Sequence, residues 1–345
     1  MQPYPLTFEP MLKEKVWGGR RLERYGKALP EGVTIGESWE IADLDETSAT
    51  GGGGGSAHSV IDAGPMQGKT IRDAIKRWGV ELLGQRGLIA GRAFGVRGDP
   101  AFPLLVKYLD ASEHLSVQTH PSPAYAERHD DAKLKTETWY VLDAARTTRA
   151  DGVETDPSLF IGLNPGLNAE RLRDRASSGA IVTDLGAAPA HPGDCWTLPS
   201  GTLHALGAGV LVAEIQTPSD TTFRVYDWQR EYDRPDRELH LAEAAQCVDY
   251  SASVHDTPKG SGVGRVADTS YYTIDRVEPG AGAALPEGCC VVVMAIEGEG
   301  ELTGAGDPVP LPRGRTALVP AVCAGAVTLR GDDSFAALVV RIGVG

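Results

Sequence analysis

The apolar residues of this chain occur in short runs rich in Val, Ile and Leu, and turn-forming residues separate these runs. The 345 residues include 42 Gly and 23 Pro, which interrupt regular helices and strands. Clear examples of such runs begin at Leu104, Val210, Val291 and Ala336. Many short strands punctuated by turns are typical of β-sandwiches and barrels. We therefore expect a mainly β fold.

Two segments follow a helical period instead. Residues 70–83 carry apolar side chains three or four positions apart, at Ile71, Ala74, Ile75, Trp78 and Leu82. This spacing predicts a small helical segment near residues 70–88. A second helix is expected over residues 168–176, where Asn168 is placed to cap the first turn.

The composition argues against several classes of partner. Lys and Arg total 33 and Asp and Glu total 47, which gives a formal net charge of −14. Because no basic block offsets this excess, neither nucleic acid nor a membrane surface is expected as the main partner. The sequence shows no signal-peptide pattern and no apolar run of membrane-spanning length. The five cysteines form no Cys-x-x-Cys pair, so we expect a cytoplasmic location and no disulfide framework.

Polar residues at four positions have the chemistry of a metal site. Gln118 and His120 lie two positions apart, and in a strand such residues point to the same face. Glu137 and His204 lie in two further strand-like segments. Two imidazoles, a carboxylate and an amide suit Zn²⁺, although iron, manganese and cobalt accept the same donors. A site of this kind with open coordination positions indicates an enzyme.

A faint internal repeat indicates two related β-units. Residues 192–199 resemble residues 313–320, and at the same offset His204 falls on Gly325. A chain of this length can bury more than one core. The second unit, from about residue 260, is therefore expected to lack metal-binding residues.

Seven segments carry a family resemblance, and they occur in family order: residues 15–19, 36–40, 103–109, 115–121, 135–140, 199–206 and 214–228. Among them are Gln-x-His-Pro from Gln118, Lys-x-Glu from Lys135 and Gly-x-x-His-Ala from Gly201. With these motifs the chain resembles the type I phosphomannose isomerases in their short bacterial form. These are zinc-dependent cupin enzymes that interconvert mannose 6-phosphate and fructose 6-phosphate. Beyond about residue 260 the resemblance is to a generic cupin.

The resemblance implies two cupin domains, each a jelly-roll β-sandwich. The catalytic domain would span residues 1–250, including the helical segment, and a cupin-like domain without metal ligands would span residues 260–345. It also implies one Zn²⁺ per chain, bound by four residues: Gln118, His120, Glu137 and His204. The reaction would be an aldose–ketose isomerisation through a cis-enediol, with a sugar phosphate as partner and a monomer or weak homodimer as the assembly.

The resemblance further places basic side chains at the substrate. Arg224 would stabilise the enediolate or position the substrate, and Ser116 and Lys107 would lie on the phosphate side of the pocket. Lys135 should share the strand face of Glu137. It would contact phosphate or take part in proton transfer, since burial beside a cation favours a neutral amine that can act as a base.

Acidic and aromatic residues complete the expected pocket. Glu214 is a candidate for substrate binding and, like Asp220, for acid–base work. Trp17 and Trp39 could line the sugar pocket, because aromatic faces suit sugar C–H surfaces, or they could belong to the core. The sequence leaves open which group moves the proton.

Three other interpretations stay open at this point. A metal-dependent cupin oxygenase would need Fe(II) and an apolar pocket, and would leave Lys107, Lys135 and Arg224 without a role. A non-catalytic sugar-binding cupin should have lost a metal ligand or Arg224, and the chain retains them all. An isomerase of another sugar phosphate would have the same residues.

Overall fold

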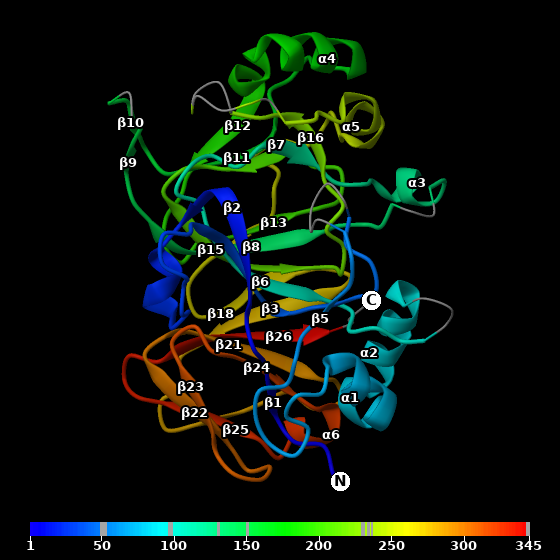
Figure 1. Ribbon diagram of the computed structural model, residues 1–345, viewed down its shortest axis with the longest axis vertical. Coiled ribbons are helices and arrows are strands. Elements are labelled where there is room, and N and C mark those ends of the chain that lie inside the picture. The colour runs from blue at the N-terminus through cyan, green and yellow to red at the C-terminus, as the bar shows by residue number, and fades with distance from the viewer. Residues whose placement is uncertain are drawn as a thin grey trace.

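The computed structural model describes residues 1–48, 54–95, 99–129, 132–149, 152–228, 232, 235 and 237–342. The predicted mainly β fold is confirmed, because antiparallel sheets account for most of the regular secondary structure (Figure 1). The sheets lie in layers stacked along the long axis of the molecule, with the C-terminal sheets at one end.

Two sheets build the half of the molecule that holds most of the predicted site residues. The seven-stranded sheet has the order β17 (Lys259–Gly260), β13 (Cys195–Leu198), β8 (Glu137–Ala144), β15 (Val210–Gln216), β6 (Leu105–Asp110), β3 (Ile35–Ile41) and β2 (Met11–Gly19). The five-stranded sheet has the order β12 (Leu185–Pro189), β11 (Ser158–Leu163), β14 (His204–Leu206), β7 (Val117–Thr119) and β16 (Phe223–Tyr226). Apolar residues from both sheets pack together, for example Trp139 and Val212 against Leu159 and Leu206. The two sheets therefore form a sandwich.

Two further sheets build the C-terminal half. The six-stranded sheet has the order β1 (Leu6–Thr7), β24 (Thr316–Val319), β21 (Val291–Glu297), β26 (Ala336–Ile342), β19 (Tyr272–Val277) and β18 (Gly264–Asp268). The four-stranded sheet has the order β20 (Ala283–Ala284), β25 (Thr328–Gly331), β22 (Glu299–Thr303) and β23 (Val309–Pro312). Strand β1 pairs with β24, so the N-terminal end of the chain joins the C-terminal sheet. The division into domains at residues 250–260 stays a prediction.

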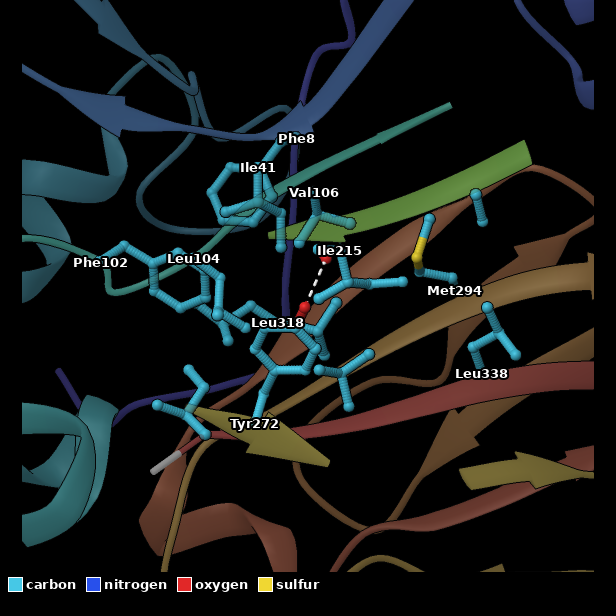
Figure 2. Packing of buried hydrophobic residues seen from close by; sticks show 14 of the residues in the cluster. Phe8, Ile41, Phe102, Leu104, Val106, Ile215, Tyr272, Met294, Leu318 and Leu338 are labelled. Carbon is cyan, nitrogen blue, oxygen red and sulfur yellow. Dashed lines mark hydrogen bonds between the residues drawn. The ribbon is translucent and has the colours of Figure 1, made fainter. Parts of the chain in front are cut away.

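Side chains along the central strands point alternately to the two faces of the sheet, which explains why the layers stack. In β21, Val292 and Met294 pack toward the seven-stranded sheet, whereas Val291 and Val293 pack toward the four-stranded sheet. Figure 2 shows Met294 and Leu338 of the six-stranded sheet across the core from residues of the seven-stranded sheet. Because successive side chains point to opposite faces, a run of buried apolar residues gives a strand with two buried faces.

Helices flank the stacked sheets (Figure 1). They are η1 (Arg21–Tyr25), α1 (Ile71–Trp78), α2 (Val80–Phe94), α3 (Pro123–Ala126), α4 (Ala169–Ser178), η2 (Ala180–Asp184), α5 (Leu241–Cys247) and α6 (Ala321–Ala324). Two small sheets have two strands each: β4 (Asp43–Leu44) pairs with β5 (Ala57–His58), and β9 (Thr147–Thr148) pairs with β10 (Glu154–Thr155). Both predicted helices are present, the first as α1 and α2. Thr70 caps α1 in a reciprocal capping box with Asp73, and Asn168 caps α4 as expected. Among the helices described, none has the length and apolar character needed to cross a membrane.

Candidate active site

Three of the predicted metal ligands meet between the seven-stranded and five-stranded sheets. His120 follows β7, while Glu137 and His204 begin β8 and β14. The Nε2 atom of His120 lies 3.3 Å from Glu137 Oε2, and that of His204 lies 3.1 Å from Glu137 Oε1. One donor atom from each residue lies within 4.8 Å of the other two, and all three side chains are buried.

Hydrogen bonds to the backbone fix the tautomer of both imidazoles. Nδ1 of His120 donates to the Thr221 carbonyl and Nδ1 of His204 to the Thr202 carbonyl, each at 2.9 Å. Because a carbonyl only accepts, Nδ1 carries the proton and Nε2 keeps its lone pair on the side of Glu137. Burial, aided by the charge of Lys135, lowers the pKa of His120 to about 3. The ring is therefore neutral at pH 7, as a metal ligand must be.

The three residues fit a divalent cation on the chemistry of their donors. Neither buried oxygen of Glu137 has a regular hydrogen bond among the described residues. The positive charge nearby comes from Lys135, whose Nζ lies 2.8 Å from Glu137 Oε2 and 3.0 Å from His120 Nε2. Two nitrogen lone pairs and a carboxylate facing one another are unfavourable unless a cation lies near them.

Gln118 adjoins this group through its amide. It is cross-strand neighbour to both His204 on β14 and Arg224 on β16, so the three side chains form one row across the five-stranded sheet. Its Nε2 lies 3.5 Å from His204 Nε2, and its Oε1 lies 3.4 Å from Ser116 Oγ. The amide thus faces His204 with its nitrogen, although exchange of the two amide atoms would direct the oxygen there instead. Its role as a fourth ligand stays a prediction.

A cleft of about 130 Å³ opens beside the three residues. It is lined by the other seven residues predicted for the site, which are Trp17, Lys107, Ser116, Gln118, Lys135, Glu214 and Arg224. Trp39 and Asp220, which were considered as well, also lie in its wall. The structure thus brings all ten predicted residues to one region, although their individual functions remain predictions.

Register explains how the seven-stranded sheet contributes to the cleft. Trp39, Lys107, Glu214 and Trp139 are successive cross-strand neighbours on β3, β6, β15 and β8. Residues at these positions share a face of the sheet. On β15, Glu214 therefore faces the cleft while its neighbours in sequence face the core behind.

Charges in the cleft alternate in sign. Nζ of Lys107 lies 3.1 Å from Glu214 Oε2 and 3.7 Å from Glu37 Oε2. Burial alone would lower the pKa of Lys107, but the negative charges of Glu214 and Glu37 outweigh burial and raise it. Burial likewise opposes ionisation of Glu37, yet Lys107 and Lys15 lower its pKa to about 2. Lys107 is therefore a permanent cation at neutral pH.

Arg224 presents a buried guanidinium to the opposite wall of the cleft. Its Nη1 donates to the Glu238 carbonyl at 2.8 Å, while its Nε has no acceptor among the described residues. Burial, followed by the charge of Arg237, lowers the pKa of Arg224. Arg237 also lines the cleft, and Asp227 holds it in an ion pair. This wall can bind an anion.

Two charged residues of the cleft, Glu37 and Arg237, were not predicted from the sequence. Glu37 lies two positions before Trp39 in a strand, so alternation alone could have placed both on the cleft face. Arg237 lies outside the described strands and helices, and no periodic pattern identifies it.

The chain is similar to mannose-6-phosphate isomerases in sequence and in structure. No protein-family model matches the chain. The chain is 33% identical over 343 residues to a protein of Bacillus subtilis (strain 168) named as a probable mannose-6-phosphate isomerase, covering 96% of this chain and 98% of that protein. It is 31% identical over 333 residues to a mannose-6-phosphate isomerase of the same organism, covering 93% and 94%. The crystal structure of the mannose 6-phosphate isomerase from Bacillus subtilis matches with a TM-score of 0.74 at 28% identity, covering 99% of this chain and 100% of that one.

Proposed function

Because the chain belongs to the mannose-6-phosphate isomerase family, we propose that its cleft interconverts mannose 6-phosphate and fructose 6-phosphate through a cis-enediol. The observation that carries this proposal is the convergence of His120, Glu137 and His204 beside a cleft that contains several cationic side chains. An anionic sugar phosphate suits such a cleft, and the apolar pocket of a cupin oxygenase would not need its charges.

The reaction requires a proton carrier and a group that stabilises an oxyanion. We propose one Zn²⁺ per chain, held by His120, Glu137 and His204, with Gln118 as a fourth ligand. When bound, the ion supplies Lewis-acid polarisation of the sugar oxygens. Two lone-pair nitrogens and a buried carboxylate support this assignment.

Two lysines of the cleft are proposed to have different functions, one in proton transfer and one in phosphate binding. Lys135 would carry the proton between the two carbons, since its Nζ lies among the metal donors and also lines the cleft. A cation bound at those donors would favour the neutral amine, which can accept a proton. Lys107 is held as a cation by two carboxylates, so it is better suited to binding an anion than to accepting a proton. With Ser116, Lys107 would bind the phosphate side of the substrate.

Three more residues are proposed to hold the sugar. Arg224 would stabilise the enediolate, because its Nε is buried without an acceptor among the described residues. Glu214 would accept hydrogen bonds from sugar hydroxyls while Lys107 and Trp139 fix its carboxylate, at 3.1 Å and 3.2 Å. Trp17 would offer its aromatic face to the sugar carbons.

We also propose that the enzyme acts in the cytoplasm, as a monomer or a weak homodimer. The five cysteines are all free and buried, which fits a reducing compartment.

A coupled assay with a panel of substrates tests the proposed function. The purified protein would be supplied with mannose 6-phosphate, glucose 6-phosphate and unphosphorylated mannose, and fructose 6-phosphate or fructose would be measured. Turnover of mannose 6-phosphate well above the other two is expected. Preference for another aldose phosphate would overturn the choice of sugar, and binding without any turnover would favour a non-catalytic sugar-binding cupin.

A further inference from the structure

Tyr272, in the C-terminal half, reaches the strands that carry the active site. It begins β19 of the six-stranded sheet and is fully buried. Its hydroxyl donates to the Ile215 carbonyl on β15 at 2.8 Å, the dashed contact in Figure 2. The same oxygen lies 3.0 Å from Thr138 Oγ1 on β8. One phenol therefore joins both strands to the sheet behind them.

Only one assignment of protons satisfies these contacts. Because a carbonyl cannot donate, the Tyr272 proton goes to Ile215, and Thr138 must donate its own proton to the Tyr272 oxygen. Thr197 Oγ1, 3.1 Å from Thr138 Oγ1, must then donate to Thr138. The result is a directed chain of hydrogen bonds from Thr197 through Thr138 and Tyr272 to Ile215, across β13, β8 and β15.

The position of this chain in the register connects it to the cleft. Ile215 and Thr138 are a direct cross-strand pair. The pair on one side is Gln216 with Glu137, and the pair on the other side is Glu214 with Trp139. Neighbouring residues of a strand point to opposite faces of the sheet. The phenol therefore contacts strands β8 and β15 from the face opposite to the one on which Glu137 and Glu214 lie.

We propose that Tyr272 is a positioning residue for the isomerisation, and that the six-stranded sheet thereby completes an active site to which it contributes no cleft-lining side chain. This inference rests on the proposed function. Glu137 lies 3.1 Å and 3.3 Å from the two imidazoles, so small displacements of β8 change the spacing of the metal donors. Misplacement of catalytic groups by about 1 Å can reduce a rate by about a hundredfold.

Tyr272→Phe tests the hydroxyl alone. It keeps the buried ring and removes the oxygen that contacts Ile215 and Thr138. Tyr250→Phe is the matched control, since the Tyr250 hydroxyl also donates to a backbone carbonyl, that of Ala245 at 3.1 Å. For each variant, kcat and KM for mannose 6-phosphate would be measured, together with the affinity for Zn²⁺ by competition with a chromophoric chelator. The denaturation midpoint would show any general loss of stability.

For Tyr272→Phe we expect kcat and Zn²⁺ affinity to fall by about tenfold, as for residues that orient metal ligands from outside the coordination shell. KM should change by less than about twofold, and Tyr250→Phe should match the wild type in kcat, KM and Zn²⁺ affinity. If Tyr272→Phe does not fold, Thr138→Val removes the same contact from the other strand and should give the same losses, with Thr138→Ser restoring both.

A Tyr272→Phe protein with wild-type kcat and Zn²⁺ affinity would overturn the positioning role, and so would a loss of stability alone. Failure of the proposed function is distinguishable from this outcome, because the wild-type protein itself would then show no turnover. The Zn²⁺ titration would still report on the position of Glu137 in that case.

Discussion

The ammonium of Lys135 lies 2.8 Å from a carboxylate oxygen of Glu137, two positions further along the chain. Its Nζ also lies 3.0 Å from Nε2 of His120. The lysine therefore supplies positive charge to a buried group that otherwise holds one carboxylate and two nitrogen lone pairs. A divalent cation at these donors would share the Glu137 carboxylate with the lysine, which links metal binding to the proposed proton carrier.

Replacement of this lysine should separate metal binding from proton transfer. Lys135→Met keeps much of the buried volume but has no exchangeable proton, so kcat should fall by about 10²–10⁴-fold. The affinity for Zn²⁺ should stay near that of the wild type, because the three donors remain. Steady-state kinetics and a Zn²⁺ titration test this. Joint loss of zinc and turnover would show that Lys135 supports the metal site instead.

Removal of a proposed ligand should release the metal without unfolding the protein. In His204→Ala we expect less than one tenth of the wild-type zinc content, no measurable turnover and an unchanged circular dichroism spectrum. His191 is exposed, so His191→Ala is the matched control and should keep both zinc and turnover. Full activity in His204→Ala would refute the metal assignment.

Arg224 should act mainly on the transition state. Arg224→Ala is expected to keep zinc and to lose about 10²–10³-fold in kcat, because a preorganised cation stabilises the developing oxyanion. Arg173→Ala, on the exposed side of α4, should leave kcat unchanged. A rise in KM at constant kcat would instead identify Arg224 as a residue for ground-state binding.

The stability of the protein should fall in mild acid because of His114. Burial, followed by the charge of Arg149, lowers the pKa of His114 to about 4, whereas an unfolded histidine titrates near 6.5. The unfolded chain thus binds more protons between these values. The contribution of His114 to folding stability is complete above pH 6.5 and falls by at most about 3 kcal/mol as the pH drops to about 4.

Urea unfolding of wild-type protein and His114→Asn between pH 7 and pH 5 tests this linkage. The ring accepts a hydrogen bond from the Ala208 amide at 3.1 Å and stacks on Trp228. Asparagine can retain the acceptor but not the stacking, so the variant should be less stable at pH 7 and should depend less on pH. Equal slopes for the two proteins would assign the acid sensitivity to other groups.

Local patterns sufficed to predict much of this molecule. Helical spacing located α1. The continuous apolar runs that begin at Val210 and Val291 predicted strands, and β15 and β21 confirm them. Each of these features depends on residues within a few positions of one another, where backbone geometry alone decides which side chains share a face.

Contacts between distant segments could not be predicted in this way. Glu37 helps to keep Lys107 charged, and this contact exists because Lys107 lies beside it on another strand. Tyr272 meets Ile215 from 57 positions away and from a different sheet. Packing of whole layers creates both contacts, and no periodicity in either segment specifies the partner.

The central claim is that the buried group of His120, Glu137 and His204 holds the metal on which isomerisation depends. Its most direct test is a coupled assay of the purified protein with mannose 6-phosphate, before and after treatment with a chelator and again after addition of Zn²⁺. We expect turnover that the chelator removes and that one equivalent of Zn²⁺ per chain restores. Undiminished turnover in protein shown to be free of metal would contradict the claim.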